Sequence, residues 1–194
     1  MRIITGSARG TRLETREGED TRPTAERVKE ALFSMIQFEI EGREVLDLFA
    51  GSGQLALEAL SRGAAKATLV DIEQEAVKII KSNAQRTKLF DRCVVLGSDW
   101  KTFVRNSAHK KQFDIVFLDP PYALGIIPEV LRKLTEADML RENALVICES
   151  DTKEPFCAEG MRVRRHSRYG RVYITLLEKC AEDEETACED ADNE

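Results

Sequence analysis

Asp119-Pro120-Pro121-Tyr122 is the tetrapeptide with the clearest capacity for chemistry in this chain. It closes the apolar run 113–118, which predicts a buried strand, so it stands at the strand end where open α/β sheets bind ligands. The two prolines stiffen the backbone and leave the Pro120 carbonyl free to accept a hydrogen bond. An acid, a fixed carbonyl and an aromatic ring could hold a planar base by its exocyclic amine. Taken alone, the tetrapeptide is equally compatible with an ordinary turn.

A glycine turn follows the short apolar strand 45–48 and leads into a helix. Gly51 and Gly53 allow a sharp turn and the close approach of a ligand. Gly51, Gly53 and Ala56 also have the spacing of a dinucleotide-binding fingerprint, and Asp71 follows about 20 residues later, so an NAD-linked oxidoreductase has to be considered. In either case a carboxylate at Asp71 could accept hydrogen bonds from ribose hydroxyls.

Three features favour S-adenosyl-L-methionine (SAM) over a dinucleotide. Asp47 directs a carboxylate toward the glycine turn, where it would repel a pyrophosphate but suit the ammonium of a methionine. Asp99 and Trp100 end a third strand and offer an acid and an indole to an adenine. Hydride transfer has no evident use for the tetrapeptide at 119–122. We therefore expect a SAM site made by Asp47, Phe49, Ala50, Gly51, Ser52, Gly53, Asp71, Ile72, Asp99 and Trp100.

The chain resembles the RsmD-type family of bacterial methyltransferases in motifs that run in the family's order over most of its length. These motifs are Arg2 to Gly6 with Arg9-Gly10, Thr21-Arg22-Pro23-Thr24 with residues 27–33, and the segments 47–53, 57–63 and 117–122. The chain departs from the family at Gln54, where a small residue is usual, and at Asp71, where glutamate is common. The acidic tail after Lys179 has no dependable counterpart.

The resemblance implies methylation of the exocyclic N2 amine of a guanine in small-subunit (16S) ribosomal RNA, free or in an assembling 30S subunit. Asp119, Pro120, Pro121 and Tyr122 are then the expected catalytic residues: Asp119 and the Pro120 carbonyl hold the amine, and Tyr122 stacks on a flipped base. The tetrapeptide does not distinguish one exocyclic amine from another, so an adenine-N6 enzyme remains an alternative. An RNA-binding module of the same fold without activity is a further one.

Charge is distributed unevenly along the chain. The net charge is −6, but residues 181–194 carry eight acids and no base, so residues 1–180 hold 29 basic and 27 acidic side chains, a net charge of +2. Basic residues gather in the segment 2–16, which we expect to lie on phosphates beside the active site, and in the segment 162–171, which could equally be a solvated hairpin edge. The expected RNA-binding residues are Arg2, Arg9, Arg12, Arg22, Thr24 and Arg168.

Composition favours a cytoplasmic enzyme, expected to be a monomer. The length of 194 residues fits one domain with a full core. The sequence contains no long apolar run and no signal-peptide pattern, so we expect no membrane partner. Five cysteines without a C-x-x-C pair and two histidines predict neither a disulfide framework nor a metal site.

Alternating strands and helices predict an α/β, doubly wound, Rossmann-like fold, which the resemblance to the RsmD-type family implies is the SAM-dependent methyltransferase fold. Its mostly parallel seven-stranded sheet should end in an antiparallel hairpin formed by residues 162–177. A helix from a Thr24 N-cap to about residue 39 should precede the sheet. The expected domains are an N-terminal arm and helix (1–43), a methyltransferase domain (44–180) and a disordered acidic tail (181–194).

Overall fold

One mixed sheet organises the part of the chain that the computed structural model describes, residues 1–15 and 23–181, with the backbone alone for 23–25. Its strand order is β3-β2-β1-β4-β5-β7-β6. The first five strands run parallel, whereas β7 is antiparallel to both β5 and β6. The predicted seven-stranded sheet with its terminal hairpin is therefore confirmed. The strands are β1 Glu44–Asp47, β2 Lys66–Asp71, β3 Cys93–Gly97, β4 Phe113–Leu118, β5 Leu140–Ser150, β6 Met161–Tyr169 and β7 Val172–Lys179.

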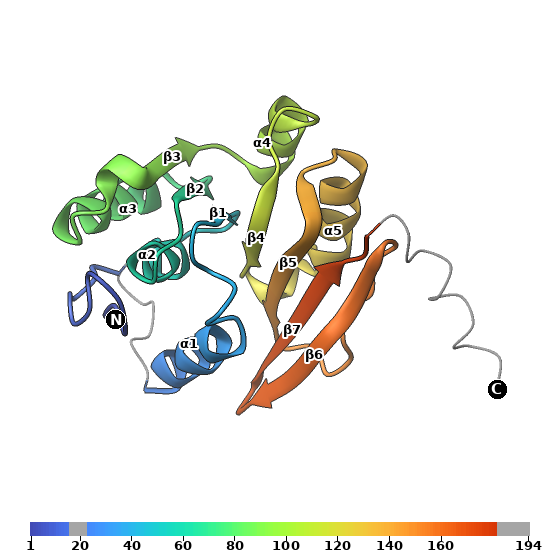
Figure 1. The fold of residues 1–194 in the computed structure, drawn as a ribbon, viewed down its shortest axis with the longest axis horizontal. Helices are drawn as coiled ribbons and strands as arrows, with labels where there is room; N and C mark the ends of the chain where they lie inside the picture. The colour runs from blue at the N-terminus through green and yellow to red at the C-terminus, as the bar shows by residue number, and fades with distance from the viewer. Residues whose placement is uncertain (16–22, 182–194) are drawn as a thin grey trace.

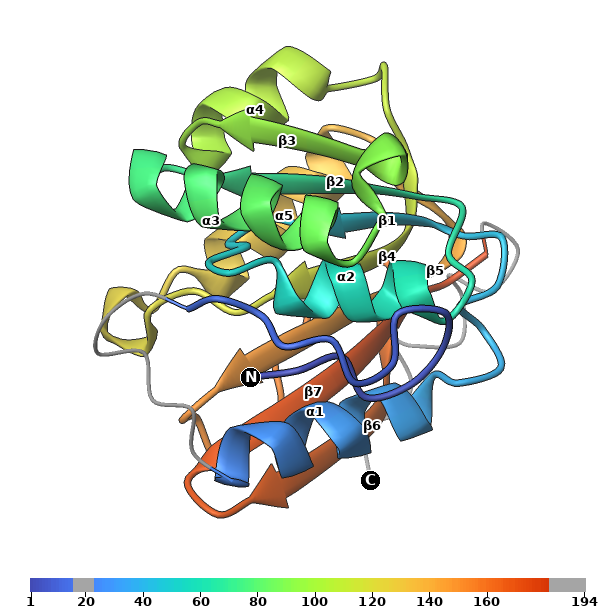
Figure 2. The ribbon, with the colours of Figure 1, turned by 90° about the vertical axis from the view of Figure 1, so that its left-hand side faces the viewer.

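Helices cover both faces of the sheet (Figures 1 and 2). The helices α1 Pro23–Met35, α2 Gln54–Ser61 and α3 Gln74–Arg86 lie on one face, and α4 Trp100–Ser107 and α5 Ile127–Glu136 lie on the other. Two short 3₁₀ turns complete the structure, η1 Phe90–Arg92 and η2 Tyr122–Leu124. Each face has its own buried hydrophobic cluster, which is the layer arrangement expected when amphipathic helices bury their apolar sides against a parallel sheet.

The order in which the chain adds strands to the sheet reverses between the neighbouring strands β1 and β4. From β1 the chain continues to β2 and β3 on one side, then returns to β4 and β5 on the other. Ligands of open α/β sheets bind at such a switch point, outside the carboxyl ends of the strands. The glycine turn follows β1 there, and Asp119 follows β4.

The N-terminal segment is a packed loop rather than the arm that the sequence suggested. An antiparallel bridge joins Arg2 to Arg12, and Ile3 and Leu13 are buried in the same cluster as α2. The tip of the loop lies against the C-terminal end of α2, because Ser7 N donates to Ser61 O at 2.8 Å. That end of α2 is the end remote from the glycine turn.

A buried ion cluster fixes this loop and α1 to α2. Glu58 is fully buried and accepts hydrogen bonds from the amides of Ile4 (2.7 Å) and Thr5 (3.0 Å). Its carboxylate also pairs with Arg62 at 2.8 Å and with the buried ammonium of Lys29 at 3.6 Å. Burial lowers the pKa of Lys29, while the neighbouring Glu58 raises it. Breaking a buried pair by removing one partner typically costs about 3 to 5 kcal/mol, so this cluster is a main support of the N-terminal loop.

The first helix differs from its prediction at both ends. It begins at Pro23, so Thr24 lies inside its first turn and is not the N-cap. It ends at Met35, four residues early, because Glu39 N donates to Ile36 O in a tighter turn. Arg22, residue 16 and the tail 182–194 fall outside the described residues.

The hairpin of β6 and β7 brings its turn to the ligand-binding edge of the sheet. Tyr173 at the start of β7 is the register partner of Ser150 at the end of β5, and Arg168 is the partner of Tyr173. The guanidinium of Arg168 lies 5.7 Å from the Tyr173 ring centroid, and its Nε donates to Gly170 O at 2.8 Å. Arg162, by contrast, pairs with Glu178 at the opposite edge.

Within residues 1–15 and 23–181, none of the helices is long and apolar enough to cross a bilayer.

Candidate active site

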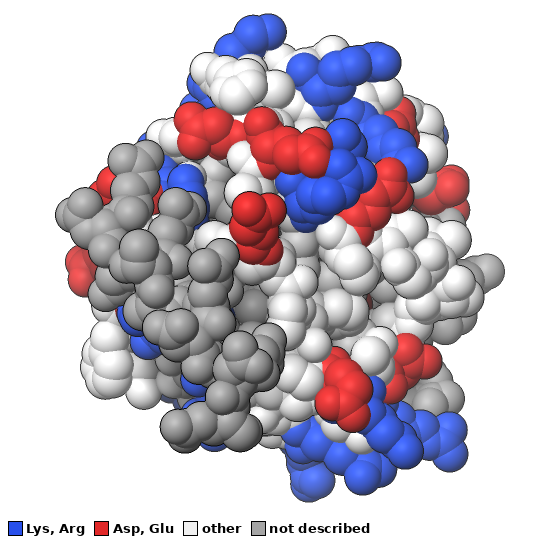
Figure 3. Space-filling model, turned by 90° about the vertical axis from the view of Figure 1, so that its right-hand side faces the viewer, with Lys and Arg blue, Asp and Glu red and all other residues white. Residues whose placement is uncertain are grey.

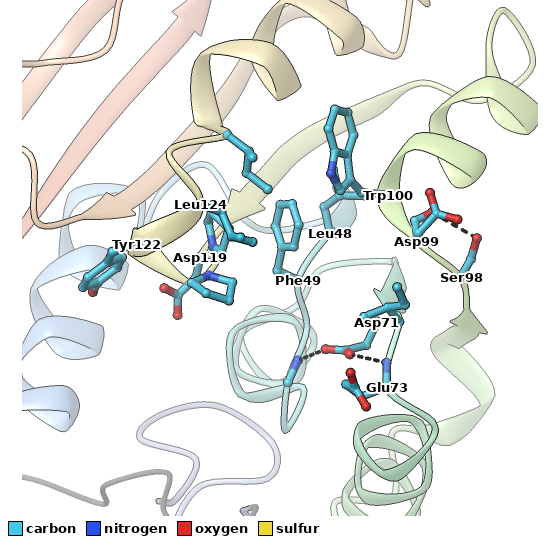
Figure 4. A pocket seen from close by; sticks show the side chains of 15 residues that line it. Leu48, Phe49, Asp71, Glu73, Ser98, Asp99, Trp100, Asp119, Tyr122 and Leu124 are labelled. Carbon is cyan, nitrogen blue, oxygen red and sulfur yellow. Dashed lines mark hydrogen bonds between the residues drawn. The ribbon is translucent and has the colours of Figure 1, made fainter.

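Two adjoining cavities lie at the carboxyl ends of the parallel strands. The larger has a volume of about 660 Å³, and Figure 4 shows Asp119 and Tyr122 on one side of it and Asp71 and Asp99 on the other, with Phe49 and Trp100 between them. The smaller, of about 320 Å³, shares four of these lining residues, Phe49, Gly51, Asp119 and Tyr122. It adds Met1, Thr15, Asp47, Ala50, Ser52, Gln54, Leu55 and Glu149.

The structure thus brings together all of the expected catalytic residues and all but one of the expected cofactor residues. The exception is Gly53, which shapes the turn without lining either cavity. Gly53 has a φ of 77°, and a Cβ on it would lie 3.1 Å from the Leu69 side chain and 3.4 Å from Ile80. Only glycine combines that conformation with that close packing at little cost.

Asp71 supports the glycine turn itself. Its Oδ2 accepts a hydrogen bond from Gly51 N at 2.8 Å, and its Oδ1 accepts one from Glu73 N at 2.9 Å (Figure 4). Each carboxylate oxygen can accept a second bond, so the expected contact with ribose hydroxyls remains open. Glu73, which the sequence analysis did not single out, adds its own carboxylate to the same wall.

Asp47 is the buried acid beside the glycine turn. It is 1% exposed, and its Oδ2 accepts a hydrogen bond from Ala56 N at 3.2 Å. Its Oδ1 has no partner among the described residues, and neither has the buried Oε1 of Gln54 in the same cavity. Burial raises the pKa of Asp47 to about 7, and the charge of Asp71 adds to the rise. Two unpartnered acceptors in a cavity require a donor, and an ammonium group would satisfy both.

Asp99 has a structural task as well as a place in the cavity. Its carboxylate accepts a hydrogen bond from Thr102 N at 2.9 Å and so caps α4, a helix that the sequence analysis did not predict. This bond lowers the pKa of Asp99. Because the cap starts α4 at Trp100, the indole is held at the cavity wall, where it could pack against an adenine.

The Asp-Pro-Pro-Tyr segment is held by its own turn. Leu124 N donates to Pro121 O at 3.0 Å, so the turn uses the second proline carbonyl and not the first. The hydroxyl of Tyr122 donates to Glu149 Oε1 at 2.9 Å. Burial, followed by the charges of Glu149 and Asp119, raises the pKa of Tyr122. Glu149, which lies within β5, was missed in the sequence, although it directly follows the apolar run 144–148, and an acid after an apolar run is the same signal that identified Asp119.

The expected RNA-binding residues do not gather at one place. Arg9 sits at the tip of the N-terminal loop, beside the end of α2 that is remote from the glycine turn, whereas the hairpin turn with Arg168 shares the edge of the cavities. Arg2 pairs with Glu26 at 3.5 Å. On the face shown in Figure 3, Lys and Arg side chains form two groups at opposite ends, separated by mostly uncharged surface.

The donor set fits a sulfonium cofactor with an amino-acid end. Acceptors lie at the glycine turn for an ammonium, carboxylates lie at the tip of β2 for hydroxyls, and an indole and an acid lie at the end of β3 for a purine. A pyrophosphate would meet the carboxylates of Asp47 and Asp71 at the glycine turn. Among the described residues no group of three or more His, Cys, Asp or Glu could hold a metal ion.

Comparisons with known proteins agree with this geometry. The model of the family described as Conserved hypothetical protein 95 matches residues 1–178. Ribosomal RNA small subunit methyltransferase D of Haemophilus influenzae is 36% identical over 156 residues, which cover 80% of this chain and 81% of that protein. The solved structure of yhhF from Escherichia coli is 34% identical, with a TM-score of 0.83 over 93% of this chain and 98% of that one.

A more distant structure shows the fold alone. An RNA methyltransferase from Salinibacter ruber in complex with S-adenosyl-L-homocysteine is 17% identical, with a TM-score of 0.61 over 83% of this chain and 95% of that one. The fold is that of SAM-dependent methyltransferases. None of these relatives is named as an oxidoreductase, so the NAD-linked alternative finds no support.

Proposed function

The chain belongs to the RsmD-type family, whose model is described as Conserved hypothetical protein 95, and from this premise we propose that it methylates small-subunit ribosomal RNA. The target is the exocyclic N2 amine of a guanine in 16S RNA, free or in an assembling 30S subunit. The observation that carries the proposal is the junction of the two cavities at Asp119 and Tyr122. This junction supports the proposal because the Asp-Pro-Pro-Tyr segment borders both cavities, so a base held there would lie next to a bound cofactor.

The protein's part in the reaction is to orient a weak nucleophile. The lone pair of an exocyclic amine is delocalised into the ring, so the amine must turn toward tetrahedral geometry before it can attack. Asp119 and the Pro120 carbonyl accept its two N–H groups and hold it in that orientation. SAM supplies an electrophilic methyl group on a positively charged sulfur. Tyr122 packs on the base, and Asp119 or water takes the proton once the amine has been alkylated.

The direct test is mass spectrometry of nucleosides from small-subunit RNA prepared with and without this protein. We expect N2-methylguanosine to depend on the protein. The appearance of N6-methyladenosine instead would establish the adenine alternative, and no change in any nucleoside would favour an inactive RNA-binding module.

Asp119→Ala tests the mechanism. The substitution removes an acceptor that acts on the base, so turnover should fall by orders of magnitude while calorimetry finds nearly unchanged affinity for SAM. Glu142→Gln, on the exposed N-terminal part of β5, is the matched control and should keep full activity. A fully active Asp119→Ala enzyme would contradict the mechanism.

A further inference from the structure

Glu149 and Asp119 occupy corresponding positions on neighbouring strands. Leu118 of β4 and Cys148 of β5 are register partners, so Asp119, just past the end of β4, and Glu149, the next residue within β5, lie side by side. Parallel strands lie about 4.8 Å apart, which puts both carboxylates within reach of one edge of a purine. Both residues line the smaller cavity together with Tyr122.

One oxygen of Glu149 is occupied and the other is open. Oε1 accepts the hydroxyl of Tyr122 at 2.9 Å, which fixes the carboxylate and the aromatic ring relative to each other. Among the described residues, Oε2 has no hydrogen-bond donor. Burial raises the pKa of Glu149, whereas the bond from Tyr122 lowers it. A partly desolvated carboxylate with an unfilled acceptor site is stabilised by a ligand that brings an N–H group.

Purine edges differ in the atom that this oxygen would meet. The Watson–Crick edge of guanine presents the N1–H donor next to its N2 amine, whereas adenine presents N1 as an acceptor next to its N6 amine. In the orientation that puts the amine at Asp119 and the N1 side of the base toward β5, this ring nitrogen faces Glu149. We propose that Glu149 is the residue that selects guanine, by accepting the N1–H hydrogen bond through Oε2 and repelling the N1 lone pair of adenine. This inference rests on the proposed function.

The test changes the side chain of residue 149 on the protein side of the contact and the target base on the RNA side. In Glu149→Gln the hydroxyl of Tyr122 can still donate to the amide oxygen, which places an NH₂ donor where Oε2 was. The RNA substrate is prepared with guanine or with 2-aminopurine at the nucleotide that the wild-type enzyme methylates. 2-Aminopurine keeps the N2 amine but has an acceptor at N1. Single-turnover rates of the four combinations form a double-mutant cycle, in which any effect of the missing O6 cancels.

A hydrogen bond to a charged group changes a rate by roughly 10- to 150-fold. We expect the wild type to prefer guanine by at least that factor and Glu149→Gln to lose the preference. Glu142→Gln is the control and should keep the wild-type ratio. Circular dichroism and SAM affinity establish that Glu149→Gln is folded. If Glu149→Gln does not fold, the wild-type enzyme alone tests the proposal. A ratio near one between its rates on guanine RNA and on 2-aminopurine RNA overturns the proposal without any variant.

The remaining outcomes separate the two proposals. An unchanged preference in Glu149→Gln, or equal loss of activity on both RNAs with normal SAM binding, would overturn the selection by Glu149 alone. A wild type that methylates adenine and not guanine would overturn the proposed function as well.

Discussion

Asp47→Asn should stabilise the cofactor-free protein at alkaline pH while weakening its affinity for SAM. Burial raises the pKa of Asp47 from 3.8 to about 7. A raised folded-state pKa means that the stability contribution is present below pH 3.8 and is lost as the pH rises through 7. At 1.36 kcal/mol per pKa unit, the ionised carboxylate costs about 4 kcal/mol at pH 8, and about 2 to 3 kcal/mol of that loss develops between pH 5 and pH 8. Asparagine has the same shape and does not ionise.

Urea unfolding of both proteins at pH 5 and pH 8 measures this effect. The difference between their free energies of unfolding isolates Asp47, because other titrating groups contribute equally to both. Calorimetry at pH 8 should show a loss of SAM affinity of about 1.5 to 3 kcal/mol, the usual contribution of a hydrogen bond to a charged group. Parallel pH profiles for the two proteins, or tighter SAM binding by the variant, would refute the assignment of Asp47 to the ammonium.

Two further substitutions test the support of the N-terminal loop and the path of the RNA. Glu58→Gln leaves the ammonium of Lys29 buried without its counter-charge, so the free energy of unfolding should fall by about 3 to 5 kcal/mol, whereas the exposed Glu30→Gln should change it by less than about 0.5 kcal/mol. Equal effects of the two in urea unfolding would show that the cluster is not a main support. Arg168→Ala should lower the salt dependence of RNA affinity by roughly 0.7 to 0.9 for each phosphate that is no longer neutralised, and Arg9→Ala, remote from the cavities, should leave it unchanged. The reverse order in filter binding at several salt concentrations would move the RNA path to the N-terminal loop.

The sequence was sufficient for the parallel part of the sheet because those strands contain short apolar runs separated by helices, and the alternating pattern of residues 162–177 indicated the hairpin. It was also sufficient to place Asp47, Asp71, Asp99 and Asp119 at one edge of the sheet, because each ends or closely follows a strand and parallel strands end at one edge. Glu149 obeys the same rule but was missed, since its neighbours form no motif. Two structural features identify Glu149 as part of the site: the register of β4 and β5, and the hydrogen bond from the hydroxyl of Tyr122.

Long-range contacts account for the other differences. The loop closes on itself through the bridge between Arg2 and Arg12, but its place on the sheet depends on contacts with Glu58 and Ser61, more than fifty positions away, which the sequence of residues 1–15 does not indicate. The arginines of that loop consequently looked like an extended basic arm. Conversely, Arg168 could not be placed from sequence, since its position at the cavity edge depends on how β7 pairs with β5.

Negative side chains line the cavities and a positive side chain lies outside them, so we expect bound RNA to take one orientation. The cavities are lined by carboxylates, among them Asp47, Asp71, Asp119 and Glu149, which repel phosphates. The same groups attract a cationic cofactor and the N–H donors of a base edge. Arg168 lies outside the cavities on the hairpin turn, where it can neutralise the backbone. Under the proposed function we therefore expect phosphates to bind at the rim and bases inside, so that an unstacked nucleotide enters base first and meets Asp119 with its amine.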